Sequence, residues 1–142
     1  MILYIKDQNN DSIIKCLNKE ELIYNKSSFS VVKKLCKDNL IDYYSYIKIL
    51  KNKIEFKYNL AIYLNPNLIL FNIYSIRNKN NIWINYKELI GCYNENDYFV
   101  FLFNNDIRLN IKISLNKIQR LLNICELIIN YKNTRYFYWI ML

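Results

Sequence analysis

Short apolar runs separated by asparagine-rich breaks cover most of the chain. Within the runs, apolar residues either alternate with polar ones or follow each other directly, and both patterns are typical of β-strands. The strands expected from this pattern are residues 2–5, 12–17, 22–25, 53–57, 60–64, 68–73, 82–86, 98–103 and 107–113. Because only Asn104-Asn105-Asp106 separates the last two, these strands should pair as a hairpin.

Two other segments show helical spacing. Residues 28–50 are predicted to form one long helix, because apolar residues recur there on one side. Its buried stripe should consist of Val31, Val32, Leu35, Leu40 and Ile47. Ser114 is a good N-cap for a second helix near residues 115–131. The expected fold is therefore α+β, an antiparallel sheet with a long helix near residues 28–50 and a second near 115–131.

Turns must be made almost without glycine and proline, because Gly91 and Pro66 are the only two in the sequence. Asn and Asp can replace them, since both tolerate the left-handed backbone. The loops are therefore expected at the asparagine clusters in residues 9–11, 65–67, 78–81 and 104–106. A chain of 142 residues has room for one core, so residues 1–142 are predicted to be a single domain.

Charge is distributed unevenly along the chain. The net charge is +8, but Ile, Asn, Lys and Tyr make up 77 of the 142 residues, which AT-rich codons would produce whatever the function. Residues 26–57 hold eight lysines and three acids, residues 107–142 hold six basic residues and one acid, and residues 86–106 hold one lysine and four acids. Two basic blocks around an acidic one favour a surface that binds a polyanion. Ordinary solvated lysines on helix exteriors are the alternative.

The residue types argue against catalysis and metal binding. Without histidine and with one glycine, the chain has neither a Ser-His or Cys-His dyad nor a glycine-rich phosphate loop. Cys16, Cys36, Cys92 and Cys125 form no CxxC pair, so we expect free thiols, no metal and no cofactor. No helix-turn-helix or zinc-finger spacing is present either.

The apolar stretches are short. None approaches the roughly 18 residues of a membrane span, and the opening residues lack the pattern of a secretory signal, so a cytoplasmic protein without a membrane partner is expected. Residues 136–142 are strongly apolar for a chain end. They should form either a strand or tail packed on the core or a surface for self-association.

An ordered series of short motifs resembles a known family. The series contains Ser30-Val31-Val32-Lys33-Lys34-Leu35-Cys36-Lys37, Tyr43, Lys57, Leu60-Ala61-Ile62-Tyr63-Leu64, residues 68–71 with Ser75, Trp83-Ile84, Phe103-Asn104-Asn105, Ile111-Lys112-Ile113-Ser114 and Gln119. In order and spacing it resembles the competence transcription factor family, ComK, over roughly residues 22–125. The chain departs from the family pattern at Ser45-Tyr46, where the family has Gly-Arg, and at Asn72-Ile73, where it has Pro-Thr.

The resemblance implies a non-enzymatic transcription activator of competence or DNA-uptake genes. It would bind AT-rich promoter sites of double-stranded DNA, largely through the minor groove, as a homo-oligomer and with RNA polymerase as a further partner. The physics agrees, because cations neutralise phosphates and are attracted into the narrow minor groove of A-tracts. The candidate DNA-binding residues are Lys33, Lys34, Lys37, Arg77, Lys79, Arg108, Lys112, Lys117 and Arg120.

Individual residues and the function as a whole have competing interpretations. Arg77 is the first candidate for insertion into a groove, because it lies in a polar loop from which an arm could reach. Trp83 and Cys36 are expected to be core residues rather than contacts. The alternative function is a protein–protein adaptor that has lost DNA binding and uses the aromatic C-terminus. A small enzyme is the third and weakest hypothesis.

Overall fold

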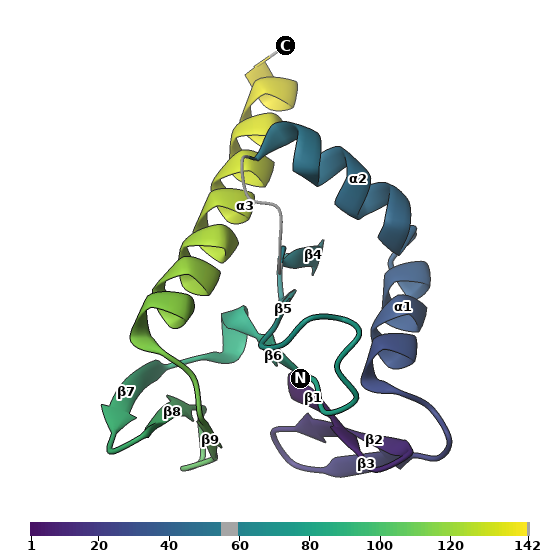
Figure 1. Cartoon of the computed structure of the whole chain (residues 1–142). Helices are drawn as coiled ribbons and strands as arrows, with labels where there is room; N and C mark the ends of the chain where they lie inside the picture. Colours follow the sequence, from purple (N-terminus) through teal and green to yellow (C-terminus); the bar gives the residue numbers. More distant parts are fainter. Residues whose placement is uncertain (55–59, 142) are drawn as a thin grey trace.

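The computed structural model describes residues 1–54 and 60–141, with the side chains of residues 134–141 outside the description. Two antiparallel sheets and a set of helices make up the fold, which confirms the α+β class (Figure 1). The larger sheet has the strand order β3-β2-β1-β6-β5-β4. Its strands are β1 (Ile2–Gln8), β2 (Asp11–Cys16), β3 (Glu20–Ile23), β4 (Ile62–Asn65), β5 (Leu68–Asn72) and β6 (Ile82–Asn85).

A smaller sheet consists of β7 (Gly91–Glu95), β8 (Tyr98–Leu102) and β9 (Arg108–Ile111). The hairpin predicted between the last two strands is confirmed, with Phe99 opposite Ile111. Strand β7 was not predicted. Its residues are half-buried or exposed and include no run of apolar side chains, so the strand depends on its pairing with β8.

The prediction of one long helix over residues 28–50 is wrong. Two helices, α1 (Ser28–Asp38) and α2 (Tyr43–Lys53), are separated by a turn in which Leu40 has a left-handed backbone with φ of 61°. Leu40 therefore points away from the predicted buried stripe and is 96% exposed. The side chain of Asp42 starts the second helix by accepting a hydrogen bond from the Ser45 backbone N–H.

The second predicted helix is confirmed at its start and continues further than expected. Helix α3 spans Leu115–Met141, and Ser114 Oγ accepts a hydrogen bond from the Lys117 N–H at 3.3 Å. The strand expected for residues 136–142 is therefore wrong for the backbone up to Met141, because it continues the helix, and the packing expected for a tail lies outside the described residues. The side chains expected to mediate self-association lie outside the described residues. Most of the strand predicted at 53–57 also lies outside the described residues, and its first residue, Lys53, belongs to α2.

The two faces of the larger sheet bury two separate cores. On one face, Ile5, Ile62, Leu70 and Trp83 pack with the apolar side of α1. On the other face, side chains that alternate with these pack with the smaller sheet and α3. They include Ile69, Phe71 and Ile84 from the sheet, Phe101 from β8 and Leu121 from α3. Helices α1 and α3 consequently flank the sheet on opposite sides (Figure 1).

Helix α2 crosses the edge of the sheet between these two cores. Its first residue, Tyr43, belongs to the core under α1, whereas Leu50 belongs to the core under α3. Between them, the Tyr46 hydroxyl donates to the Ala61 carbonyl oxygen at 3.0 Å and accepts from the Tyr63 N–H at 2.9 Å. Since β4 is the last of the sheet's described strands, this side chain satisfies backbone groups at the edge of that strand.

Asparagine makes the turns, as predicted. Asn9, Asn25, Asn96 and Asn105 all have positive φ angles in connections between elements. Others are buried and organise the backbone around them. The Asn85 side chain donates to the carbonyl oxygen of Ile2 at 2.9 Å and to that of Asn67 at 3.1 Å, and its oxygen accepts from the Ile69 N–H at 3.1 Å.

Candidate nucleic-acid interface

Helix α1 is fixed in its rotation and at its start. Ser27 is the N-cap, with its hydroxyl oxygen 3.1 Å from the Ser30 N–H, and the Asp7 carboxylate accepts from the Ser28 N–H at 2.6 Å. Val32 and Cys36 are fully buried on the sheet side. Because side chains on a helix repeat every 3.6 residues, this burial places the intervening lysines on the outer side.

Three of the predicted cations share one open pocket between α1 and the start of α2. Its volume is about 390 Å³. The lining residues are Ser30, Lys33, Lys34, Lys37, Asp42, Tyr43 and Tyr44, and we call it the α1 pocket. With three lysines and one aspartate, its lining is net positive and suits an anionic ligand.

An aromatic cluster supports one side of this pocket. Phe29 stacks on the buried Trp83 with ring centroids 6.2 Å apart, and Tyr43 meets Phe29 edge-on at 4.9 Å. The Lys33 Nζ lies 4.6 Å from the Phe29 ring centroid and 5.9 Å from that of Tyr44. These cation–π contacts orient the ammonium group without neutralising its charge. Trp83 and Cys36 are core residues, as expected.

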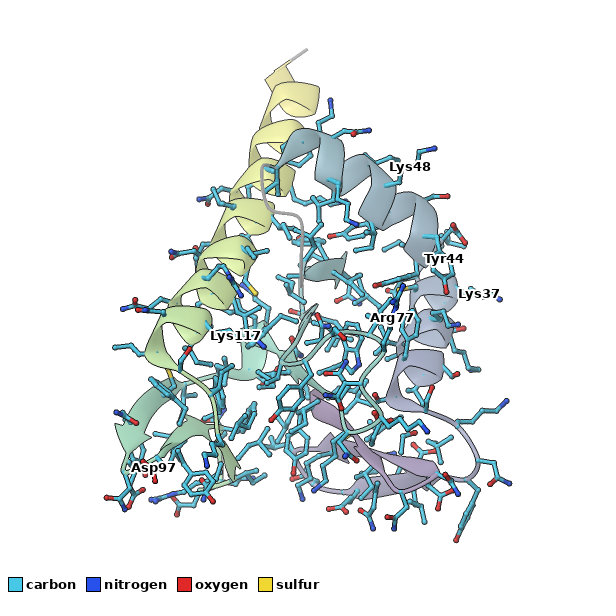
Figure 2. The ribbon with its side chains drawn as sticks, viewed as in Figure 1. Lys37, Tyr44, Lys48, Arg77, Asp97 and Lys117 are labelled. Carbon is cyan, nitrogen blue, oxygen red and sulfur yellow. The ribbon has the colours of Figure 1, made fainter. Side chains whose placement is uncertain are left out.

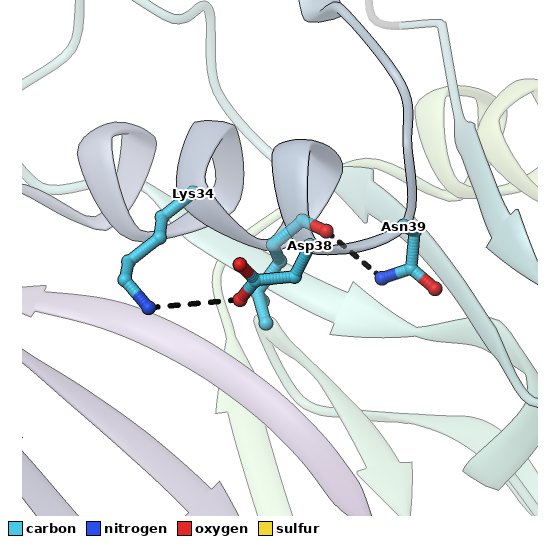
Figure 3. A network of polar contacts seen from close by, with 4 residues as sticks. Lys34, Asp38 and Asn39 are labelled. Atoms are coloured by element: carbon cyan, nitrogen blue, oxygen red, sulfur yellow. Dashed lines mark hydrogen bonds and ion pairs between the residues drawn. The ribbon is translucent and has the colours of Figure 1, made fainter.

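Lys34 is paired within its own helix. Its Nζ lies 3.6 Å from the Asp38 carboxylate, one turn further along α1, and the adjacent Asn39 amide donates to the Leu35 carbonyl oxygen at 2.8 Å (Figure 3). Both partners of the ion pair are exposed. Exposed pairs of this kind contribute roughly 0.2–1 kcal/mol, so a phosphate could replace Asp38 at little cost.

At neutral pH, Asp42 supplies one negative charge to the α1 pocket and Tyr43 supplies none. The backbone N–H and side chain of Ser45 lower the pKa of Asp42 below its ordinary range, so its carboxylate remains charged. Burial raises the pKa of Tyr43 to about 12, with a smaller contribution from Tyr44, so its hydroxyl remains neutral. The negative charge in the lining is thus limited to the Asp42 carboxylate.

Arg77 and Lys79 lie in the loop between β5 and β6, and both are exposed. The base of this loop is held by Asn81, whose side-chain oxygen accepts from the Tyr74 N–H at 3.1 Å and whose own N–H donates to Asp7 at 2.9 Å. The same Asp7 holds the start of α1, so loop and helix share one anchor. In Figure 2, Arg77 lies between Lys37 on one side of the view and Lys117 on the other.

The remaining four candidates belong to the opposite side of the larger sheet. Arg108 lies on β9 and donates to the Tyr93 hydroxyl at 3.2 Å, and Lys112 directly follows that strand. Lys117 and Arg120 lie on the first turns of α3. The Lys117 Nζ is 5.6 Å from the Tyr74 ring centroid, and burial, together with nearby Arg120, lowers the pKa of Lys117. The nine predicted cations therefore do not form one patch.

The acidic block forms a region of its own. Glu95 and Asp97 lie at the β7–β8 turn, and Asp106 lies at the β8–β9 turn. Figure 2 shows Asp97 at a corner of the molecule far from Lys37 and Lys48. These three acids therefore lie on the small sheet, which also carries Arg108, and away from the lysines of α1 and α2 (Figure 2).

Two residues beside the α1 pocket were not predicted. Tyr44 lines it, and Lys48 lies one turn later on the outer side of α2 (Figure 2). Their spacing of four residues was visible in the sequence. The break at Leu40 was not predicted, although Asn39 and Asp42 are residues that cap helices, and it is this break that turns α2 so that Tyr44 faces the lysines of α1.

The cysteines are free thiols spread over the fold. Burial raises the pKa of the Cys36 thiol to about 11 and raises the pKa of Cys92 and of Cys125 as well, so these thiols are weak nucleophiles at neutral pH. Within residues 1–54 and 60–141, no group of three or more potential ligands could hold a metal ion. No helix in the described part of the chain is long and apolar enough to cross a membrane.

Comparison with known proteins places the chain in a family of transcription factors. The family model described as ComK protein matches residues 1–135, which is nearly the whole chain. The chain therefore belongs to the ComK family and is a competence-related transcription factor. This family consists of transcription factors rather than enzymes. Neither a curated protein nor a solved structure matches the chain.

Proposed function

We propose that the chain is a cytoplasmic DNA-binding activator that binds AT-rich promoter sites and regulates competence or DNA-uptake genes. The observation that carries this proposal is the α1 pocket, in which Lys33, Lys34 and Lys37 converge beside Tyr44. Lysines that converge on an open surface can bind successive phosphates of a duplex, and this contact supplies most of the affinity of many DNA-binding proteins.

The α1 side is the better candidate for the main contact. A duplex that lies along α1 cannot reach Lys117 and Arg120 at the same time, because the larger sheet separates the two helices. Lys33, Lys34 and Lys37 also converge on one pocket, whereas the cations of the other side come from β9, the connection after it and α3. We therefore assign phosphate binding first to the α1 lysines. Lys112, Lys117, Arg108 and Arg120 would serve a second duplex segment or a second copy of the chain.

Preference for AT-rich DNA would come from the loop between β5 and β6. Arg77 and Lys79 are exposed there, and Arg77 is the candidate for insertion into a narrow minor groove. An arginine in this position reads the width and the potential of the groove, with little contact to base edges. Homo-oligomerisation through residues 136–142 and contact with RNA polymerase complete the proposal.

Binding of AT-rich and GC-rich duplexes over a series of salt concentrations tests this function. Affinity should fall linearly with salt in a log–log plot, with a slope of about −0.9 for each phosphate contact. Arg77→Ala should reduce the preference for the AT-rich duplex, whereas Lys37→Ala should weaken both duplexes equally. Undetectable binding at low salt, or equal affinity of the wild type for both duplexes, would favour the adaptor hypothesis instead.

Self-association has a separate test. Light scattering should give a mass above that of one chain for the full-length protein and a smaller mass for a chain that stops at Arg135. A monomeric full-length protein would remove the homo-oligomer from the proposal and leave DNA binding unaffected.

A further inference from the structure

Leu40, in the turn between α1 and α2, combines two unusual properties. Its side chain is 96% exposed, which is the largest exposed fraction among the large apolar side chains in the described part of the chain. Its backbone is left-handed, with φ of 61°. Non-glycine residues with this conformation are usually Asn or Asp, as at the other five such positions of this chain.

The backbone conformation is imposed by the end of α1. The Leu40 N–H donates to the Lys37 carbonyl oxygen at 3.0 Å, and the Ile41 N–H donates to the Cys36 carbonyl oxygen at 2.8 Å. This pair of hydrogen bonds ends many helices, and the left-handed position in it is usually glycine. A leucine there is strained and buries almost none of its side chain, so it contributes nothing evident to the folded state.

The surroundings of Leu40 are cationic. Lys37, three residues earlier, and Asp42, two residues later, both line the α1 pocket, whose lysines outnumber its single acid. Asp38 is paired with Lys34. An apolar protein partner that covered Leu40 would also desolvate these lysines without neutralising them, which is costly. A polyanion would neutralise them and could also offer the leucine an apolar site.

Duplex DNA has both properties. Proteins that bind the minor groove often insert an apolar side chain, leucine included, between two base pairs while cations bind the flanking phosphates. We propose that Leu40 is such a wedge and inserts between stacked base pairs of the bound duplex, next to phosphates held by the lysines of the α1 pocket. This inference rests on the proposed function, since it requires that the chain bind DNA.

Permanganate oxidation of thymines tests the wedge on an AT-rich duplex, because unstacked thymines react faster than stacked ones. Wild type should make thymines at a defined step hyperreactive. Leu40→Asn tolerates the left-handed backbone but removes the apolar tip, so it should abolish this hyperreactivity and weaken binding on the order of tenfold. Leu40→Met should retain both. Leu127→Asn, the same change at an exposed leucine on α3, should behave like wild type.

The possible outcomes distinguish the Leu40 wedge from the proposed DNA binding. Thermal unfolding of Leu40→Asn at or above the wild-type midpoint would show that lost binding is not lost folding. If wild type binds the duplex but no thymine becomes hyperreactive, or if Leu40→Asn matches wild type, the wedge is wrong and the proposed function stands. If wild type does not bind the duplex, the proposed function fails and the wedge fails with it.

Discussion

The second half of α1 and the first two turns of α3 carry similar charge but present it differently. On α1, the apolar residues turn toward the sheet, and Lys34 and Lys37 remain exposed beside an open pocket. Lys33 is half-buried over the Phe29 ring but lines the same pocket. On α3, Arg120 is exposed, but Lys117 is half-buried over the Tyr74 ring and its pKa is lowered by that burial. Charge counted along a sequence therefore does not measure charge available to a ligand. The charge available to a ligand depends on which cationic side chains pack against an aromatic ring or the sheet.

The largest effect on DNA affinity is expected when the cations on one face of the larger sheet are removed together. The triple variant Lys33→Gln, Lys34→Gln, Lys37→Gln should bind duplex DNA on the order of a hundredfold more weakly, with a salt slope smaller by about three, because three phosphate contacts are lost. The measurement is affinity at several salt concentrations.

A matched variant on the α3 side serves as the control. Lys112→Gln, Lys117→Gln, Arg120→Gln removes the same number of charges and, on a duplex too short to offer a second segment, should change the slope by less than about one. Equal losses in the two triple variants would mean that net charge alone drives binding. A larger loss in the α3 variant would move the interface to the opposite face of the sheet.

Tyr46 packs against both cores and hydrogen-bonds to the edge of the larger sheet, so loss of its hydroxyl should lower the free energy of unfolding. Tyr46→Phe leaves the Ala61 carbonyl oxygen and the Tyr63 N–H without their partner and should lower the free energy of unfolding by about 1–3 kcal/mol. Urea unfolding measures this change. Tyr44→Phe, at an exposed position of the same helix, should change stability by less than about 0.5 kcal/mol. A Tyr46→Phe variant as stable as wild type would show that these two hydrogen bonds do not stabilise the fold.

Strain at Leu40 predicts a gain in stability of smaller size. Leu40→Gly removes an unfavourable left-handed leucine and should raise the free energy of unfolding by about 1 kcal/mol, since almost no buried apolar area is lost. The same substitution in the interior of a helix, Leu127→Gly, should instead lower it by about 1 kcal/mol. A loss of stability in both variants would mean that the leucine side chain makes contacts that stabilise the turn.

The last expected effect is absent at neutral pH: a pH dependence of stability on the α1 side in alkaline solution. Burial, with a smaller effect of Asp42, raises the pKa of the Cys36 thiol to about 11, so the folded state holds this proton more tightly than the unfolded state. The stability that this contributes is complete below the ordinary thiol pKa of about 8.5 and is lost as pH rises toward 11. Urea unfolding between these pH values should show the decline. Cys36→Ala should flatten it, and an unchanged decline would assign it to other groups.

Local patterns in the sequence determined most of the elements. Every strand except β7, the β8–β9 hairpin, the asparagine turns and the start of α3 follow from apolar spacing and from residues that favour turns or caps, and the structure confirms them with shifts at their ends. These features depend on neighbours in the chain. The positions of the lysines on α1 also follow from helical spacing.

The break at Leu40 combines two local caps with tertiary packing, because Asn39 ends α1 and Asp42 starts α2. The position of Leu40 fits the apolar stripe of one continuous helix, and no glycine marks a stop. The chain nevertheless turns there, because packing of Tyr43 and Leu50 on different faces of the sheet carries α2 over its edge. Favourable burial elsewhere thus outweighs the strain of one left-handed leucine.

The structure also explains two residues at which the chain departs from the family pattern, because both make hydrogen bonds to backbone groups that the sequence does not reveal. Tyr46 satisfies the edge of β4, and the buried Asn72 donates to the Tyr74 carbonyl oxygen at 2.6 Å at the start of the loop that carries Arg77. The sequence determined the sign and the order of its charged blocks. Only the tertiary structure decided that the sheet separates the two basic blocks, because partners distant in the chain determine which face each helix covers.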